Sequence, residues 1–223
     1  MIDAGLDVAC FPVADVAGPE TTAAIGDRAF GDDPELVARL ARIAARTLDA
    51  FGVGAVAKHA PGHGRAREDS HALLPRVDAP RAELEARDFV PFRALADVPF
   101  VMTAHVLCEA LDPERPASLS PAVHRLLRGE LGLRGIVISD DLAMGALEGP
   151  PGRRAAAARA AGADLALYCP GDVEGSEAVL EAAGELAPQV EARLAGLLAG
   201  WTARRRPLPA ERIASELERR LSA

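Results

Sequence analysis

The chain has 223 residues, enough for one domain with a sizeable core, and 49% of them are hydrophobic. Its 25 basic and 33 acidic side chains leave a formal net charge of -8, which argues against the basic surface that nucleic-acid binding requires. No window approaches the roughly 20 consecutive apolar residues of a membrane helix, and no basic, then apolar leader opens the chain, so we expect a cytoplasmic protein.

Apolar runs alternate with amphipathic segments along the chain, which is the pattern of strand–helix units and a parallel sheet. The predicted strands are residues 6–13, 53–57, 100–104, 135–139 and 164–169. Predicted helices begin after Asp33–Pro34, Ala79–Pro80 and Ser120–Pro121, each with proline in or near its first turn. Further helices are expected over residues 153–161 and 173–186, and a helical tail over 187–223 completes a single domain, 1–223.

Polar residues follow four of the five predicted strands: Asp15, Lys58–His59, His105 and Asp140–Asp141. A parallel α/β barrel keeps its chemistry at this end of its strands, and a doubly wound sheet binds ligands there too. No glycine-rich phosphate loop follows any strand, which favours the barrel. Because a complete barrel needs eight strands and roughly 250 residues, we expect an incomplete TIM-type (β/α)8 barrel without its first strands.

The sequence KHAPGHGRAREDSH begins with Lys58, the only lysine among the 25 basic residues. We therefore expect that this position needs a compact ammonium group. The alternative is a surface lysine that was retained by chance. Proline and glycine between His59 and His63 prevent a helix, so this pair is not the helical zinc motif of a protease. In a mobile loop over a pocket, Asp69 could fix the tautomer of His71 for acid/base work; an incidental loop histidine is the alternative.

The apolar segment IVISDDLAMGA, residues 136–146, contains two adjacent carboxylates at the end of its predicted strand. Neighbouring side chains of a strand point to opposite faces, so one carboxylate can face a site while the other binds structure. Asp141 suits the N-cap of a helix over Leu142–Leu147. Asp140 is therefore the candidate nucleophile.

Cysteine usage indicates no disulfide framework. Cys10, Cys108 and Cys169 are odd in number and far apart, which favours free thiols that fill the core.

Taken together, these motifs resemble glycoside hydrolase family 3, and in particular its bacterial β-N-acetylglucosaminidases of cell-wall recycling. The resemblance rests on KHAPGHG, DSH and ISDDLAMGA in that order, and it extends to FPVADV, IGDRAFGDDP, MTAHV and RPASLSP. It covers nearly the whole chain, although Ala60 stands where the family usually has phenylalanine. The resemblance implies a (β/α)8-type barrel that removes terminal β-linked N-acetylglucosamine from muropeptides, without a metal or cofactor.

By this resemblance, the reaction is a retaining hydrolysis through a covalent glycosyl-enzyme. Asp140 attacks the anomeric carbon of the sugar. His71, paired with Asp69, protonates the leaving oxygen and later deprotonates the water that releases the sugar.

The resemblance also implies which residues hold the sugar. Arg28, Lys58 and His59 match family positions that bind its hydroxyls and its N-acetyl group. His63 and His105 are expected to shape the pocket rather than to react.

The resemblance has a departure at the front of the chain. Family members carry early strands and an Asp-Gln-Glu-Gly-Gly-Arg motif before the segment that matches Ile2. We therefore expect an N-terminally truncated chain, either a fragment with a false start at Met1 or a true short protein. An open barrel exposes strand edges, which predicts self-association. An inactive remnant that oligomerises or binds, and phosphorolysis in place of hydrolysis, are the alternatives.

Overall fold

The computed structural model describes residues 1–205 and 210–222. Its strands are β1 Val8–Ala9, β2 Gly54–Ala60, β3 Arg76–Val77, β4 Phe100–Thr103, β5 Leu107–Cys108, β6 Ile136–Asp141 and β7 Leu165–Leu167. Its helices are α1 Pro34–Ala50, α2 Arg81–Glu83, α3 Val90–Ala94, α4 Pro121–Gly129, α5 Pro151–Ala161, α6 Val173–Ala183, α7 Pro188–Arg204 and α8 Ala210–Leu221. A π-helical turn, Leu84–Asp88, joins α2 to the segment before α3.

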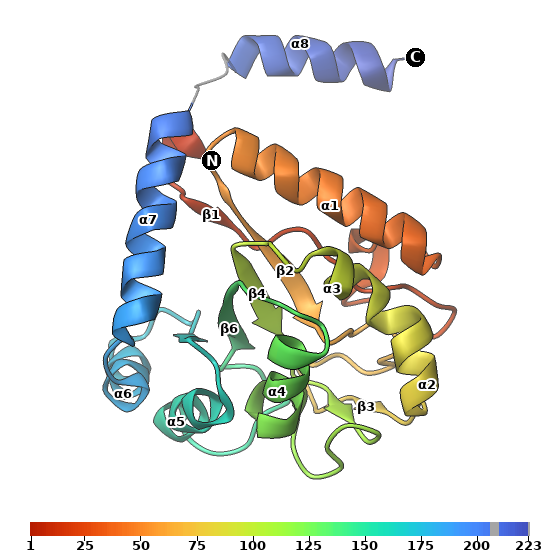
Figure 1. The fold of residues 1–223 in the computed structure, drawn as a ribbon, viewed down its shortest axis with the longest axis vertical. Helices are drawn as coiled ribbons and strands as arrows, with labels where there is room; N and C mark the ends of the chain where they lie inside the picture. The colour runs from red at the N-terminus through yellow and green to blue at the C-terminus, as the bar shows by residue number, and fades with distance from the viewer. Residues whose placement is uncertain (206–209, 223) are drawn as a thin grey trace.

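The five strands predicted from the sequence form one parallel sheet in the order β1-β2-β4-β6-β7 (Figure 1). The strand β1 is shorter than predicted. Hydrogen bonds from the N–H groups of Val56 and Lys58 to the carbonyl oxygens of Phe11 and Pro12 nevertheless extend its alignment with β2. The result is an α/β half-barrel, in agreement with the predicted fold class.

Alternation along the strands decides which residues face which layer of helices. Ala55 and Ala57 pack with apolar side chains of α1, α3 and α4. Val56 and Phe100 point the other way and pack against α7, which lies across the sheet from α1 and α3 (Figure 1). Lys58 lies two residues beyond Val56, so the backbone directs it to the same side as α7.

The tail after Leu186 begins with α7, and the apolar face of this helix packs on the sheet. Leu194, Leu197 and Leu198 are partly buried, and Trp201 is fully buried. The Trp201 ring lies 6.0 Å from the Phe100 ring, centre to centre. Residues 206–209 and 223 of the predicted helical tail lie outside the described residues.

We expect Trp201→Ala to lower the free energy of unfolding by about 3–5 kcal/mol, because it leaves a large cavity between α7 and the sheet. It also removes the hydrogen bond from Nε1 to Oδ1 of Asp49, 3.1 Å long. Urea unfolding followed by circular dichroism measures the loss. The control Leu180→Ala, at a side chain 74% exposed on α6, should stay within about 0.5 kcal/mol. Equal losses in the two variants would contradict this packing.

Two sequence predictions hold only in part. The helix expected after Ala79–Pro80 is broken by the π-helical turn, in which the N–H of Phe89 reaches back to the carbonyl oxygen of Leu84. The three cysteines are free, but only Cys108 is buried, so core filling does not describe Cys10 and Cys169.

The short strands β3 and β5 pair in a separate parallel ladder that the sequence did not predict. No helix within the described ranges is both long and apolar enough to span a membrane. Self-association stays a prediction.

Candidate active site

A cavity of about 110 Å³ opens where β2 and β6 end and where the loops after β1 and β2 approach each other. Five of the six site residues predicted from the sequence line it: Arg28, Lys58, His59, His71 and Asp140. The sixth, Asp69, is hydrogen-bonded to His71. The fold therefore gathers residues separated by more than a hundred positions in the chain.

The two carboxylates at the end of β6 have different surroundings. Asp140 lines the cavity, and one of its oxygens accepts the N–H of Asp141 at 2.8 Å. Asp141 instead accepts the N–H groups of Ala143 and Cys169, at 3.0 and 3.1 Å. This agrees with the prediction that one carboxylate faces a site while the other binds structure.

The helix predicted over Leu142–Leu147 is absent, and the segment is a series of turns. Its backbone groups bond elsewhere: the N–H of Gly145 donates to the carbonyl oxygen of His71, and that of Ala146 to Ser70. Asp141 therefore caps a turn rather than a helix. The same bonds attach the loop that carries His71 to the chain that follows Asp140.

His71 and Asp69 form a close pair at the cavity rim. Nδ1 of His71 lies 2.7 Å from Oδ1 of Asp69, which also accepts the backbone N–H of His71 at 2.9 Å. These hydrogen bonds lower the pKa of Asp69, so the carboxylate stays ionised. Both side chains are largely exposed. Since an ionised carboxylate only accepts hydrogen bonds, it holds a proton on Nδ1 and leaves Nε2 of His71 for proton transfer.

The remaining predicted residues bring donor groups to the cavity. Lys58 and His59 lie near the end of β2, where the Lys58–His59 and Ala60–Pro61 peptide bonds are cis. Arg28 reaches the cavity from the loop after β1 and donates to the carbonyl oxygen of Ala24. An ammonium and a guanidinium here offer charged donors to oxygen atoms of a ligand.

His63 and His105 are placed differently from each other. His63 lines the cavity, and its Nε2 lies 3.2 Å from Oγ of Ser70. His105 is fully buried and lies behind β6, with Nε2 3.0 Å from the carbonyl oxygen of Asp141. Burial lowers the pKa of both imidazoles, which favours their neutral forms. Only His63 shapes the cavity wall directly; His105 supports the end of β6.

Sequence reasoning assigned no role to Asp15 or Ser70. Asp15 is fully buried, and Oδ2 lies 2.7 Å from Nδ1 of His59. In the sequence, the only indication for Asp15 was its position after a predicted strand. That position reveals neither its burial nor its bond to His59. Ser70 lay inside the quoted motif, but its bond to His63 joins two loops and has no local signature.

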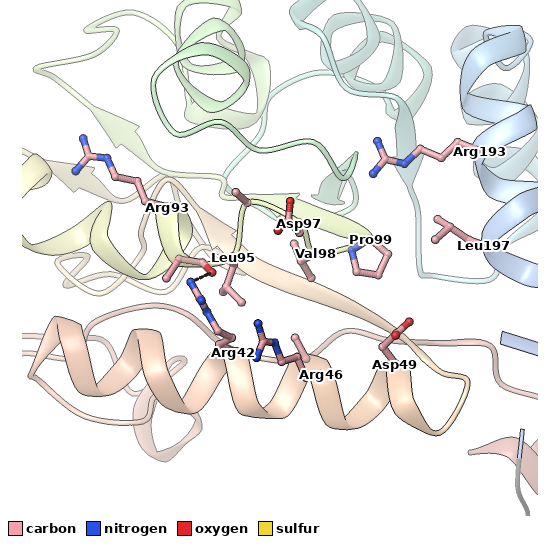
Figure 2. Close-up of a pocket in the computed structure, with 13 residues that line it drawn as sticks. Arg42, Arg46, Asp49, Arg93, Leu95, Asp97, Val98, Pro99, Arg193 and Leu197 are labelled. Atoms are coloured by element: carbon pink, nitrogen blue, oxygen red, sulfur yellow. Dashed lines mark hydrogen bonds between the residues drawn. The ribbon is translucent and has the colours of Figure 1, made fainter. Parts of the chain in front are cut away.

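A second cavity, of about 380 Å³, lies between α1, the segment before β4 and α7 (Figure 2). Arg42, Arg46 and Arg193 border it, beside Val98 and Pro99. Because Val98 and Pro99 precede β4, this cavity lies at the amino ends of the strands. It contains none of the predicted site residues. A parallel barrel keeps its chemistry at the opposite end, so the smaller cavity is the better candidate.

The smaller cavity combines a carboxylate, a histidine positioned by a second carboxylate, and cationic donors. This set can bind an oxygen-rich ligand, attack an electrophilic carbon and transfer a proton. Within the described part of the chain, no three histidine, cysteine or acidic side chains gather as a metal site would require.

Residues 1–198 match the family model of the glycosyl hydrolase family 3 N terminal domain. The chain is 47% identical over 174 residues to a Beta-hexosaminidase of Alkalilimnicola ehrlichii, covering 76% of this chain and 49% of that protein. It is 42% identical over 196 residues to a Beta-hexosaminidase of Chromobacterium violaceum, covering 86% and 53%. The chain thus spans about half the length of these curated relatives.

Solved structures show the same relationship. A glycoside hydrolase family 3 β-N-acetylglucosaminidase from Paenibacillus superposes with a TM-score of 0.79 at 37% identity, covering 92% of this chain and 43% of that one. Native NagZ from Neisseria gonorrhoeae gives 0.68 at 31% identity, covering 91% and 65%. The family model, the sequence relatives and the solved structures all point to the same family. The chain belongs to the glycosyl hydrolase family 3 N-terminal domain family.

Proposed function

We propose that the protein is a retaining glycoside hydrolase that removes terminal β-linked N-acetylglucosamine. The observation that carries the proposal is that Asp140 and His71, the latter paired with Asp69, line one cavity. Relatives named Beta-hexosaminidase support the substrate class. So does NagZ from Neisseria gonorrhoeae, 32% identical to this chain, whose structure was solved with N-trifluoroacetyl-D-glucosamine.

The reaction has two steps. In the first, a carboxylate oxygen of Asp140 bonds to the anomeric carbon, the bond from that carbon to the aglycone oxygen breaks, and His71 gives this oxygen a proton. In the second, His71 takes a proton from water, the water oxygen bonds to the anomeric carbon, and the bond to Asp140 breaks. Two inversions retain the β configuration.

Arg28, Lys58 and His59 hold the sugar during both steps. All three line the cavity wall, and their charged or polar donors suit the hydroxyl groups and the N-acetyl oxygen of a sugar. We further propose muropeptides in the cytoplasm as the natural substrates. The resemblance to cell-wall recycling enzymes supports this proposal.

Release of 4-nitrophenol from its N-acetyl-β-glucosaminide by the 223-residue chain tests the proposal. We expect turnover, with β-N-acetylglucosamine as the first anomer detected by proton NMR. Phosphate buffer should give no sugar 1-phosphate. Absence of turnover would support the inactive remnant, the α-anomer as first product would indicate inversion, and a sugar 1-phosphate would indicate phosphorolysis.

The contact between Gly145 and the His71 loop gives a prediction at a residue outside the cavity. A β-carbon at Gly145 would lie 2.6 Å from the carbonyl oxygen of Ala72 and 2.8 Å from that of His71. Gly145→Ala should therefore displace the acid/base pair and lower kcat/KM on an alkyl N-acetyl-β-glucosaminide, which needs the acid, by about 10²-fold. Gly129→Ala, on α4 with open space around it, is the matched control. Similar activity in the two variants would show that the loop does not depend on this contact.

A further inference from the structure

Asp15 is a carboxylate without solvent contact, held behind the cavity by hydrogen bonds. Its Oδ1 accepts the backbone N–H of His63 at 2.7 Å, and Oδ2 lies 2.7 Å from Nδ1 of His59. The N–H of His59 also points at the carboxylate, at 3.2 Å. Burial by itself raises the pKa of Asp15, but the interactions of the carboxylate with His59 and His63 outweigh it and hold the pKa below its usual value. Asp15 is therefore ionised.

An ionised carboxylate accepts hydrogen bonds and donates none, so Nδ1 of His59 must carry a proton. This leaves Nε2 as the nitrogen of His59 that can bind a ligand. In the described part of the chain, Nε2 has no hydrogen-bond partner, and His59 lines the cavity. The carboxylate thus determines both the orientation of the ring and the position of its proton.

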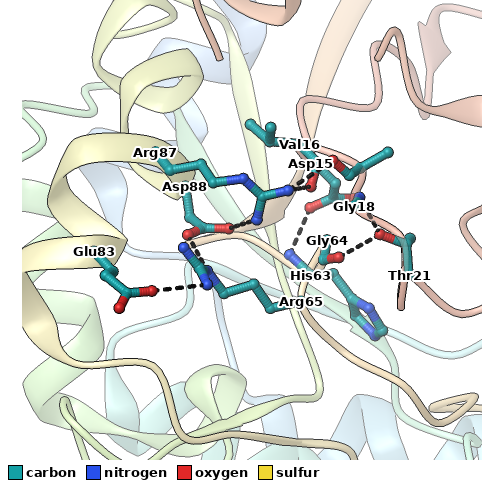
Figure 3. Close-up of polar contacts among 11 residues, drawn as sticks. Asp15, Val16, Gly18, Thr21, His63, Gly64, Arg65, Glu83, Arg87 and Asp88 are labelled. Carbon is teal, nitrogen blue, oxygen red and sulfur yellow. Dashed lines mark hydrogen bonds and ion pairs between the residues drawn. The ribbon is translucent and has the colours of Figure 1, made fainter. Parts of the chain in front are cut away.

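A second buried carboxylate, Asp88, links the segment that follows Asp15 to the segment that follows His63 (Figure 3). Asp88, 2% exposed, accepts a hydrogen bond from Nε of Arg65 at 2.7 Å and pairs with Arg87 at 3.4 Å. Arg87 donates to the carbonyl oxygen of Ala17 at 2.6 Å. Arg65 follows His63 by two residues, and Ala17 follows Asp15 by two, so one side chain braces both segments.

The two braced segments also touch directly. A β-carbon at Gly64 would lie 1.9 Å from the carbonyl oxygen of Val16, so only glycine permits this approach. Thr21 adds a bond from Oγ1 to the carbonyl oxygen of Gly64, 2.5 Å long. The backbone around Asp15 and His63 therefore has little freedom to shift, and a rigid surrounding shell is what precise ligand positioning requires.

We propose that Asp15 is a positioning residue of the sugar site, which holds His59 with its proton on Nδ1 so that Nε2 faces the bound N-acetylglucosamine. The inference rests on the proposed function and adds a residue to its site. Asp15 touches neither the sugar nor the reacting atoms and acts through His59.

Asp15→Asn tests the proposal with little change in volume. The amide oxygen can still accept one N–H, but the amide NH2 cannot accept the proton of Nδ1, so the tautomer of His59 should change. We expect kcat/KM on the 4-nitrophenyl glycoside to fall about 10²-fold. In a His59→Gln background, the same substitution should cost less than about threefold, because the side chain through which Asp15 acts is already missing. Equal losses in both backgrounds would overturn the proposal.

Nitrogen-15 NMR of histidine-labelled protein gives a readout that needs no activity. The signal of His59 Nδ1 is assigned because it disappears in His59→Gln. We expect this nitrogen to be protonated in the wild type and unprotonated in Asp15→Asn. An unprotonated Nδ1 in the wild type would overturn the proposal even if the variant failed to fold. Wild-type protein without turnover but with a protonated Nδ1 would contradict the proposed function and leave the Asp15–His59 pair standing.

Discussion

Replacing Asp140 with alanine is expected to lower kcat on 4-nitrophenyl N-acetyl-β-glucosaminide by about 10⁴-fold or more, because the covalent step loses its nucleophile. Asp140 lines the cavity at the end of β6, and its only described hydrogen-bond donor is the neighbouring backbone N–H. The substitution should therefore change the melting temperature little. Steady-state rates and a thermal melt of the same preparation measure the two effects.

Rescue by azide distinguishes a variant that lacks only the nucleophile from one whose cavity is damaged. In Asp140→Ala, azide can occupy the vacated space, bond to the anomeric carbon and displace 4-nitrophenolate, which inverts the configuration once. We expect part of the activity to return, with an α-glycosyl azide as product. The matched variant Asp141→Asn keeps an oxygen for the N–H groups of Ala143 and Cys169, and should lose no more than about tenfold. A larger loss in Asp141→Asn than in Asp140→Ala would reverse the assignment.

Replacing His71 with alanine is expected to have an effect that depends on the leaving group. An alkyl glycoside needs a proton as its bond breaks, so kcat/KM should fall by about 10²–10⁴-fold. The 4-nitrophenyl glycoside releases 4-nitrophenolate, a stable anion that needs no proton. The value of kcat/KM on this substrate, which reports the first step, should therefore fall much less. Rates on the two substrates, compared as a ratio, isolate the acid from general damage to the cavity.

Asp69→Asn should shift the same ratio in the same direction by a smaller factor. The imidazole remains, but the 2.7 Å bond from Nδ1 to an ionised oxygen is lost, and with it the control of the tautomer. His124→Gln is a control at a buried histidine that lies outside the cavity and bonds to the carbonyl oxygen of Ser118. It should leave the ratio unchanged. A ratio that is also unchanged in His71→Ala would mean that another group protonates the leaving oxygen.

The sequence predicted the parallel strands well because each is a local apolar run bounded by turn residues. It failed where partners come from elsewhere in the chain. The segment 142–147 looks helical by itself, yet Gly145 and Ala146 donate their N–H groups to the His71 loop. The helix expected after Ala79–Pro80 contains a π-helical turn over Leu84–Asp88, and the carboxylate of Asp88 pairs with Arg65 from another loop.

The sequence by itself determined which residue types stand at the ends of the strands, and the order of its motifs identified Asp140, His71 and Lys58 as candidates. Only the tertiary structure decided that these side chains share one cavity, and that α7 covers the face of the sheet to which Lys58 belongs. Asp15 shows the physical reason. Its burial and its bond to His59, 44 residues away, depend on how two loops pack, and no local pattern encodes that distance.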